Sequence, residues 1–279
     1  MKNILIPTDF SENSHNAIRY ALDYFAAIPV NFYLLHVSQH NQSTTAEVSR
    51  SFFESSSRKE LEYNPTSLLK EEIESCQLLT KNPYHKFYSI TDDKLLIEAI
   101  RKQVVEKEID TILMGTKGDS QSNQGEMGSH TYDVITKVKC PIIVIPENAR
   151  FTGIKNIAFA TDYNCIYRNR VITTLSEALH LHSSPLRVLN IRSKHSSLNA
   201  AQTDNKGFLH YFFKEIKHSF HFLENKNIET GIQDFVDTWE ISMVAIVAKN
   251  LNFIQRLMLR PSSGKIDYHT EVPFLVLHE

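Results

Sequence analysis

The sequence predicts an α/β fold made of two tandem, doubly wound parallel sheets of five strands each, with the second domain shortened. Three observations lead to this prediction. Short apolar segments alternate with longer segments of helical periodicity, which is typical of parallel strands joined by right-handed crossovers with helices on both faces. The apolar segments are continuous, as in strands that are covered on both sides. The second half of the chain also repeats the first.

The first half is expected to alternate strands and helices along the chain. The strands are predicted at 3–8, 31–37, 84–90, 110–115 and 141–145, and the helices at 13–27, 58–80, 92–107 and 129–138. The segment Gln39–Ser57 is rich in Ser, Thr and Asn. We expect it to be a loop or frayed helix start near the carboxyl ends of the strands, or a tolerated surface insertion.

The clearest part of the repeat is an apolar strand that ends in Thr-Asp-aromatic, at Thr8–Phe10 and again at Thr161–Tyr163. The matched segments, in order, are 4–10 with 157–163, 13–27 with 168–182, 32–37 with 186–191, 109–117 with 241–249 and 140–145 with 272–277. Several matches in one order are hard to obtain by chance. A domain boundary is therefore expected in the polar link Glu147–Gly153, giving domains at 1–147 and 153–279.

The second half is expected to be shorter after its second strand. Its third strand is predicted near Asn227–Gln233, which leaves only Asp234–Glu240 before the next strand. The crossover helix there is predicted to be about two turns long or lost. Because a parallel crossover this short is unusual, displacement of the third strand is the alternative.

Composition and charge exclude several classes of protein. The 279 residues suffice for one large domain or two ordinary ones, and the formal net charge of −2 gives no basic field for nucleic acid or an anionic membrane. No apolar run approaches the roughly 20 residues of a membrane span, and no secretion signal precedes the first strand, so we expect a cytoplasmic protein. Cys76, Cys140 and Cys165 are widely spaced, as in buried free thiols rather than a disulfide framework.

A glycine motif follows the fourth strand of the first half. Gly115 and Gly118 stand at the end of that strand, and after nine residues Gly128 and Ser129 stand where the next helix begins. Main-chain N–H groups around a helix N-terminus form a binding site for phosphate. Glycines at these positions let the backbone approach a ligand closely or take positive φ, and Ser129 can cap the helix and donate to a phosphate oxygen.

These residues resemble the universal stress protein family, whose ATP-binding pattern is G-2x-G-9x-G-[ST]. The first half matches that pattern with both spacings, and its segments Ile6–Ser11 and Leu34–Val37 also match the family. The chain is similar to a tandem, two-domain member over its whole length, although the motifs are sharp only in the first half. The resemblance implies Rossmann-like domains with a nucleotide at the carboxyl ends of the strands, where Asp9, Val37 and Gly115 are expected to converge.

The resemblance also implies residue roles and a ligand. Asp9 is expected to accept hydrogen bonds from the ribose, Val37 to offer backbone groups and an apolar wall to adenine, and Pro7 and Thr8 to shape that wall. His130 replaces the small apolar residue that is usual in the family. The implied binding residues are Pro7, Thr8, Asp9, Val37, Met114, Gly115, Gly118, Gly128, Ser129 and His130. The implied ligand is ATP, or ADP or AMP, with or without Mg²⁺.

The second half departs from the pattern at every glycine. Val247, Asn250, Arg260 and Pro261 replace the three glycines and the serine. Pro261 has no N–H and Val247 is poorly suited to positive φ, so a phosphate cradle of the family type is expected to be absent. Binding of a different anion by Arg260 is an open alternative. Asp162 is retained and is expected only to close a turn.

The sequence assigns no catalytic residue and no metal ligand. It lacks a G-K-[ST] phosphate loop, a dinucleotide fingerprint and a nucleophile elbow, and it offers no dedicated base that would activate water. His210, His218 and His221 are predicted to lie at roughly one face of a helix. They are interpreted as solvated or half-buried side chains, with a metal site as the alternative.

The last strands of the two halves, Cys140–Pro146 and Val272–His278, are apolar edges that need cover. We expect them to pair, which would give an internal pseudo-dimer, and further homodimerisation is left open. The resulting hypothesis is a cytoplasmic ATP-binding regulatory protein of the stress response that acts through a protein partner. A slow ATPase or phosphotransferase, and a scaffold that no longer binds nucleotide, are the alternatives.

Overall fold

The computed structural model describes residues 1–38, 64–116, 128–164, 167, 169–192, 197–224, 234–250 and 272–279, and all structural statements concern those residues. Its strands are β1 (Lys2–Pro7), β2 (Val30–Val37), β3 (Lys86–Asp92), β4 (Thr111–Gly115), β5 (Ile142–Ile145), β6 (Ile157–Ala160), β7 (Leu186–Arg192), β8 (His218–Glu224), β9 (Met243–Val247) and β10 (Phe274–Leu277). Its helices are α1 (Glu12–Tyr24), α2 (Pro65–Leu79), α3 (Leu96–Glu106), α4 (Ser129–Lys137), α5 (Asn169–His182), α6 (Ala200–Phe212) and the 3₁₀ turn η1 (Ala248–Asn250). Residues 234–238 are also helical.

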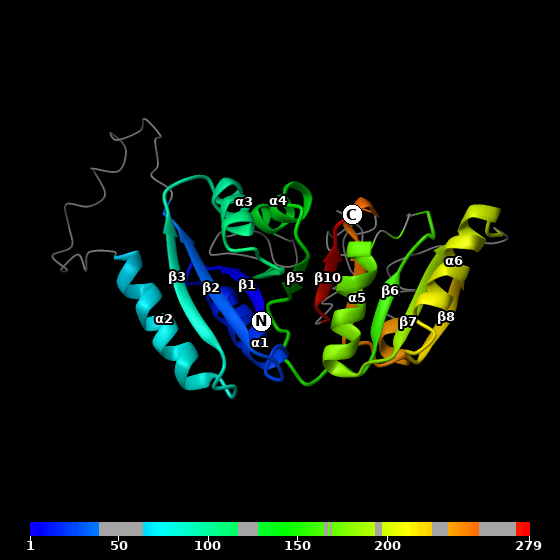
Figure 1. Cartoon of the computed structure of the whole chain (residues 1–279), viewed down its shortest axis with the longest axis horizontal. Helices are drawn as coiled ribbons and strands as arrows, with labels where there is room; N and C mark the ends of the chain where they lie inside the picture. Colours follow the sequence, from blue (N-terminus) through cyan, green and yellow to red (C-terminus); the bar gives the residue numbers. More distant parts are fainter. Residues whose placement is uncertain are drawn as a thin grey trace, which may run out of the picture.

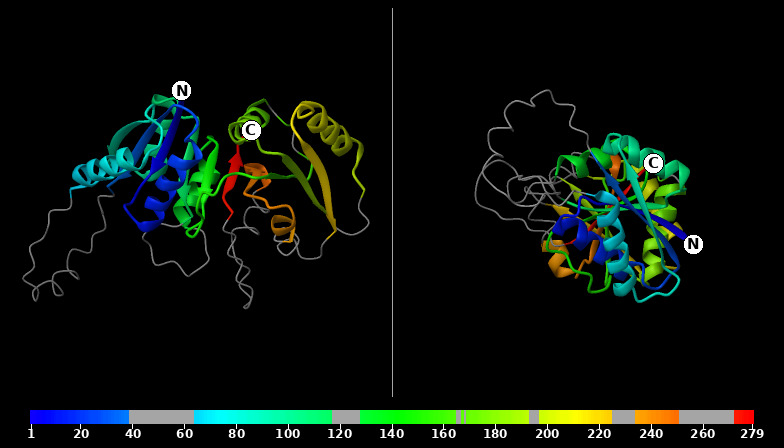
Figure 2. Two further views of the ribbon diagram at one scale, coloured as in Figure 1. Left: turned by 90° about the horizontal axis from the view of Figure 1, so that it is seen from below. Right: turned by 90° about the vertical axis from the view of Figure 1, so that its left-hand side faces the viewer.

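The ten strands form one sheet in the order β3-β2-β1-β4-β5-β10-β9-β6-β7-β8. Within each half every strand pair is parallel. The halves meet at the antiparallel pair of β5 and β10, where Ile143 lies opposite Leu275. Figures 1 and 2 show these two strands side by side in the middle of the molecule. The α/β fold with parallel five-stranded halves is confirmed, and so is the predicted pairing of the two last strands.

Helices cover both faces of the sheet (Figure 1). One core lies beneath α1, α2, α5 and α6, and the other lies beneath α3, α4 and the helical residues 234–238. Neighbouring strand residues alternate between these cores: Ile4 and Ile6 lie in the first and Leu5 in the second. All three are buried, which explains why the strands read as continuous apolar runs.

Local sequence signals account for the helix starts. Ser11 caps α1 by accepting a hydrogen bond from the Ser14 amide. Asn64 caps α2, and Pro65 occupies the first turn, where a missing N–H costs nothing. The described part of the helix predicted at 58–80 therefore begins at Pro65, and residues 58–63 lie outside the described residues, as do all of 39–57.

The prediction for the third strand of the second half is wrong. The strand is β8 (His218–Glu224), which pairs in parallel with β7, and not 227–233, which lies outside the described residues. His218, Phe220 and Phe222 alternate with polar or smaller residues, which is the two-residue period of a strand. The same aromatic-rich segment also fits a helical pattern over a short window, and this ambiguity caused the error.

The prediction of a short crossover before β9 is also wrong, because β8 ends at Glu224 and β9 begins at Met243, the same separation as between the end of β3 at Asp92 and the start of β4 at Thr111. Of the crossover helix the structure describes residues 234–238, and 225–233 lie outside the described residues, so the predicted shortening of that helix stays a prediction. Phe235 and Val236 on this helix are buried in the core of that face. The helix thus covers the same face of the second half that α3 and α4 cover in the first half.

The two halves also contact each other outside the sheet. The Asn16 side chain in α1 donates hydrogen bonds to the carbonyl oxygens of Pro146, Glu147 and Ala149, which follow β5. A cluster of aromatic side chains joins α1 to α5: Tyr20, Tyr24, Phe151 and His182. The connection between β5 and β6 is therefore fixed to the first half by polar and by aromatic contacts.

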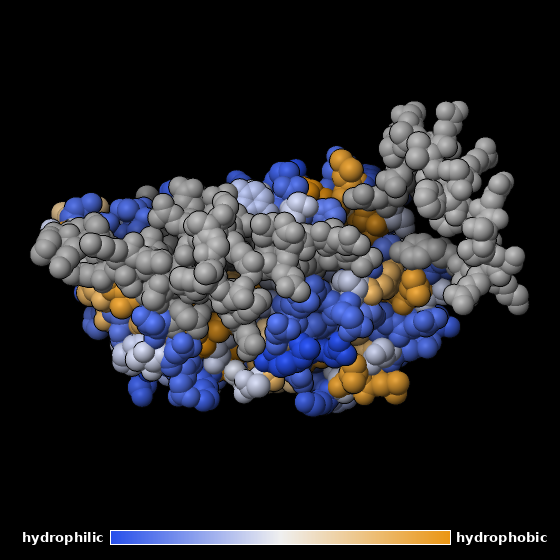
Figure 3. Space-filling model, turned by 180° about the vertical axis from the view of Figure 1, so that it is seen from behind, coloured by the Kyte–Doolittle hydropathy of each residue, from blue (hydrophilic) through white to orange (hydrophobic). Residues whose placement is uncertain are grey.

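The surface seen in Figure 3 is mainly hydrophilic, with hydrophobic residues in small separate areas. Among the described residues, none of the helices combines the length and the apolar character needed to cross a bilayer.

Candidate functional site

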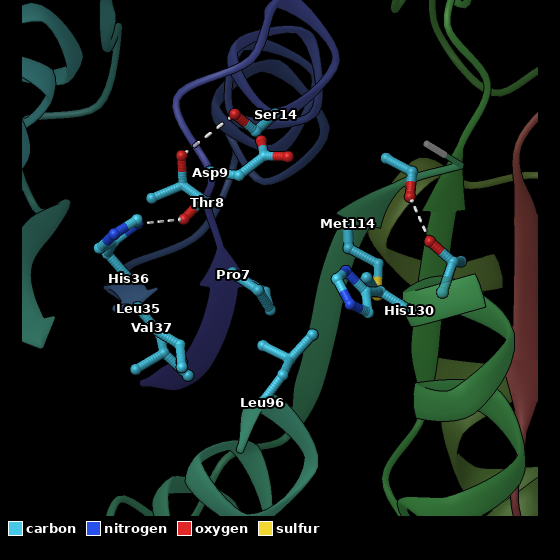
Figure 4. Close-up of a pocket in the computed structure, with 12 residues that line it drawn as sticks. Pro7, Thr8, Asp9, Ser14, Leu35, His36, Val37, Leu96, Met114 and His130 are labelled. Carbon is cyan, nitrogen blue, oxygen red and sulfur yellow. Dashed lines mark hydrogen bonds between the residues drawn. The ribbon is translucent and has the colours of Figure 1, made fainter. Parts of the chain in front are cut away.

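A cavity of about 210 Å³ lies at the carboxyl ends of β1, β2 and β4 (Figure 4). The strands supply its floor, and the first turns of α1, α3 and α4 supply its sides. The lining residues are Pro7, Thr8, Asp9, Ser14, Leu35, His36, Val37, Leu96, Met114, Gly115, His130 and Thr131. Ligands of open α/β sheets bind at this edge, where the strand order reverses between β1 and β4.

Most of the sequence-predicted binding residues line this cavity: Pro7, Thr8, Asp9, Val37, Met114, Gly115 and His130. Gly128 and Ser129 lie at the start of α4 but do not line it. Gly118 lies outside the described residues. Sequence reasoning missed Ser14, Leu35, His36, Leu96 and Thr131. Leu35 and His36 stand directly before Val37, so their place next to the cavity could have been found from the strand alone.

One part of the cavity is apolar. Leu35 and Val37 project from the same face of β2 because they are two residues apart. Met114 comes from β4 and Leu96 from the first residue of α3. Figure 4 shows Leu96 and Met114 facing the side of Pro7 across the cavity. A planar, weakly polar group such as a nucleobase suits such walls.

A tight turn after β1 forms the polar part of the cavity. Asp9 Oδ1 accepts hydrogen bonds from the Ser11 amide at 3.1 Å and from the Ser11 hydroxyl at 2.6 Å. Thr8 Oγ1 accepts from the Phe10 amide at 3.1 Å and donates to Ser14 Oγ at 3.1 Å. The turn is thereby attached to the first turn of α1, and the Asp9 carboxylate can accept bonds from hydroxyl groups of a ligand.

The reason for a glycine at position 115 differs from the prediction. Its φ is not positive, and a Cβ built there would lie 3.1 Å from the carbonyl oxygen of Asn13 in α1. The Gly115 carbonyl accepts a hydrogen bond from the buried Thr131 hydroxyl of α4 at 2.9 Å. Gly115 therefore allows β4 to pack closely against α1, while α4 is fixed to the end of the same strand.

The start of α4 also differs in detail from the prediction. Gly128 is its N-cap residue, with a φ of −59°, and no side chain caps the helix, so Ser129 is the first helical residue rather than the cap. The Gly128 amide donates to the Thr116 carbonyl at 2.7 Å, which removes that amide from the predicted phosphate cradle. The exposed His130 is the second residue of α4 and lies beside Met114 (Figure 4).

The corresponding positions of the second half are only partly described. Val247 is the buried last residue of β9, and Asn250 belongs to η1. Arg260 and Pro261 lie outside the described residues, so the predicted loss of the phosphate cradle there stays a prediction. Asp162 closes a turn as expected, because its Oδ1 accepts a hydrogen bond from the backbone amide two residues on at 2.9 Å.

The three histidines predicted at one helix face do not converge. His210 is in α6, whereas His218 and His221 are in β8 and point to opposite faces of the sheet. His210 Nδ1 and His218 Nε2 form a hydrogen bond of 2.8 Å. His221 packs against the Trp239 ring with a centroid distance of 4.3 Å. Among the described residues, no group of three or more potential ligands is close enough to hold a metal ion.

The described cysteines are free and buried. Burial raises the pKa of the Cys76 and Cys140 thiols to about 12, so neither is a reactive thiolate at neutral pH. Cys165 lies outside the described residues.

The chain matches the model of one protein family. The model of the "Universal stress protein family" matches residues 1–146, which is more than half of the chain. Comparison with curated protein sequences gives no match.

Solved structures resemble the whole chain. A universal stress protein from Archaeoglobus fulgidus DSM 4304 matches with a TM-score of 0.66 at 16% identity, covering 99% of this chain and 98% of its own. A functionally unknown protein from Pseudomonas aeruginosa PAO1 matches at 0.61 and 12% identity, covering 100% and 92%. A putative universal stress protein from Pseudomonas aeruginosa UCBPP-PA14 matches at 0.60 and 13% identity, covering 100% and 93%. At these identities the similarity concerns the fold, and it extends over both halves.

Proposed function

The chain belongs to the universal stress protein family, and from this premise we propose that it is a regulatory protein of the stress response that binds ATP, or ADP or AMP, in its N-terminal half. The observation that carries the proposal is the cavity at the carboxyl ends of β1, β2 and β4. It combines an apolar slot, a carboxylate on a rigid turn and the uncapped start of a helix. Those are three complementary surfaces for a base, a sugar and a phosphate.

In this proposal each part of the nucleotide has its own contact. Adenine lies between Val37, Leu96 and Met114, with Pro7 and Thr8 beside it. The ribose hydroxyls donate to Asp9. The phosphates lie at the start of α4, where Ser129 and His130 precede the rest of the helix and the helix dipole favours negative charge. Gly118 and the loop around it belong to the phosphate site as the family pattern implies, and Mg²⁺ can accompany the phosphates there.

We assign the second half a different task. It keeps the Thr-Asp-aromatic turn but replaces each residue of the glycine motif. We propose that residues 1–147 form the nucleotide-binding domain and that 153–279 form a degenerate domain for structure or for binding a protein partner. The protein is proposed to act in the cytoplasm through that partner, and no catalytic residue is assigned.

Two matched variants test the proposal. Asp9→Ala removes the carboxylate in the cavity, and Asp162→Ala removes its counterpart in the second half. We expect D9A to weaken ATP binding about tenfold or more, because hydrogen bonds to a charged group are each worth about 1.5–3 kcal/mol. D162A is expected to bind like the unaltered protein. Isothermal titration calorimetry with the full chain measures both.

The outcomes separate the proposal from its alternatives. Absence of ATP, ADP and AMP binding by the unaltered protein would indicate a scaffold. Phosphate release above that of a Gly118→Val control would indicate a slow ATPase. Equal loss of affinity in D9A and D162A would mean that Asp9 has no special place in the site.

A further inference from the structure

A buried histidine supports the turn that carries Asp9. His36, the residue before the end of β2, is 6% exposed, and its Nδ1 donates a hydrogen bond to the Thr8 carbonyl oxygen at 2.9 Å. The donor is assigned to the ring nitrogen because a carbonyl oxygen can only accept. Its ring also stacks on Phe10, with a centroid distance of 4.6 Å and an angle of 30° between the planes. His36 therefore contacts the residues on both sides of Asp9 in the sequence. Figure 4 shows its hydrogen bond to Thr8.

The turn needs such support because it is strained. Phe10 has a φ of 62°, in the left-handed region that residues with a side chain rarely adopt. Strain of this kind persists only where the surrounding structure holds the residue in place, and it concentrates at binding sites. Here the Phe10 amide is bonded to Thr8 Oγ1 and the Phe10 ring lies on His36.

The second half contains the same turn with a different support. Tyr163 has a φ of 59°, and its amide is bonded to Thr161 Oγ1 at 3.0 Å. Asn190 takes the place of His36: it is 3% exposed, and its Nδ2 donates to the Thr161 carbonyl oxygen at 2.8 Å. His Nδ1 and Asn Nδ2 are both attached to Cγ, so they reach equally far from the backbone. In both halves this carbonyl therefore accepts a bond from a buried side chain, supplied by His in one half and by Asn in the other.

We infer that His36 is a positioning residue for sugar recognition: by holding Thr8 and Phe10 it fixes the direction of the Asp9 carboxylate at the cavity. The inference rests on the proposed nucleotide site and adds to it a residue that determines selectivity for the ribose hydroxyls. In the second half the equivalent carboxylate, Asp162, accepts the same kind of bonds, from the amide and the side chain of Asn164 two residues on.

The test measures ribose selectivity, defined as the ratio of the affinities for ATP and for 2′,3′-dideoxy-ATP, by calorimetry on the full chain. We expect a ratio on the order of ten or more for the unaltered protein. His36→Leu removes the donor and is expected to bring the ratio close to one. His36→Asn copies the second half and is expected to stay within about threefold of the unaltered protein.

Asn190→Leu is the matched control, since it removes the same bond from the same turn in the half without the cavity. It is expected to lower the thermal midpoint as H36L does while leaving the selectivity unchanged. A selectivity lost equally in H36L and N190L would show a general loss of stability and overturn the inference. If H36L does not fold, His36→Phe keeps a ring on Phe10 and removes only the donor, and full selectivity in that variant would equally overturn the inference.

The failure of this inference is distinct from the failure of the proposed function. An unaltered protein that binds neither nucleotide overturns the proposed function, and the inference with it. If the unaltered protein prefers ATP over 2′,3′-dideoxy-ATP and a folded H36L variant shows the same preference, the inference fails while the proposed function stands.

Discussion

Gly115 illustrates how a single missing methyl group sets the geometry of the site. What demands glycine at this position is the 3.1 Å distance that a Cβ would have from the Asn13 carbonyl oxygen, not an unusual φ. Because Asn13 belongs to the first turn of α1, any displacement there also moves Ser14, which lines the cavity. Packing in this part of the protein and the shape of the cavity therefore depend on each other.

Gly115→Ala is accordingly predicted to destabilise the protein by about 1 kcal/mol and to weaken nucleotide binding, since α1 has to move by a few tenths of an ångström. The control is Gly207→Ala in the middle of α6, where a Cβ meets no atom within 4 Å. That change is predicted to stabilise the protein by about 0.5–1 kcal/mol, because alanine has the higher helix propensity. Urea unfolding measures both. Similar losses of stability in the two variants would refute the packing explanation.

The sequence predicted most of the site residues that stand at strand ends, although Leu35 and His36 of β2 were missed. Asp9, Val37 and Gly115 come from three strands, and parallel strands bring their carboxyl ends to one edge. Leu96 and Thr131 were not predicted, because they come from helices whose placement over the crevice depends on packing between elements. No local pattern in the sequence records that packing.

At the scale of elements, β8 shows where sequence patterns become ambiguous. Its seven residues fit both a two-residue and a helical period, and the order of elements alone did not decide between them. The alternating elements of the first half were predictable because its strands are covered on both faces and therefore appear in the sequence as continuous apolar runs. The antiparallel junction of β5 and β10 was predictable because each would otherwise be an apolar edge.

The hydrogen bonds between Asn16 of α1 and the link after β5 lead to a prediction at the scale of elements. Asn16 is 4% exposed and donates to three carbonyl oxygens of the link. Asn16→Leu removes these three bonds and also the bond that Asn16 Oδ1 accepts from the Arg150 guanidinium, while the Ala149 amide and Arg150 still donate to the link carbonyls. Because a hydrogen bond to a charged group is among those lost, the change is predicted to cost about 1–3 kcal/mol of unfolding free energy. Nucleotide affinity is predicted to stay unchanged, because Asn16 does not line the cavity. Calorimetry and urea unfolding of the same variant measure both quantities, and a parallel loss of affinity would contradict this separation.

The molecule as a whole is held together by more than the shared sheet. Lys2 Nζ in β1 pairs with Glu177 of α5 at 2.7 Å, and His182 of α5 lies 4.3 Å from the Tyr24 ring of α1, measured between ring centroids. Near the end of the chain, the buried His278 lies within the electrostatic influence of Arg170 and Lys139. Groups from both halves thus influence each of these two histidines, through ring contacts at His182 and through charge at His278.

Both histidines link the stability of the molecule to pH. Burial lowers the pKa of His182 and of His278 from 6.5 to about 4, and for His278 the charges of Arg170 and Lys139 add to the effect. The unfolded chain therefore binds more protons than the folded chain between about pH 6.5 and pH 4. Stability is fully present above pH 6.5 and is lost as the pH falls through this window. The two histidines together are predicted to lower the free energy of unfolding by an amount on the order of 1–3 kcal/mol across this window. This figure is smaller than the pKa shifts alone would give, because solvent screens the half-buried His182.

Thermal unfolding at pH 7 and at pH 4.5 measures this dependence. His182→Phe keeps an aromatic ring against Tyr24 and removes one titrating group, so its midpoint is predicted to fall less between the two pH values. A variant whose midpoint falls as far as that of the unaltered protein would show that His182 does not contribute.

The central claim is that only the N-terminal half binds an adenine nucleotide. Native mass spectrometry of the intact chain, titrated with ATP, tests it most directly because it counts bound ligands. We predict saturation at one nucleotide per chain. Saturation at two, or no bound nucleotide at any concentration, would contradict the account.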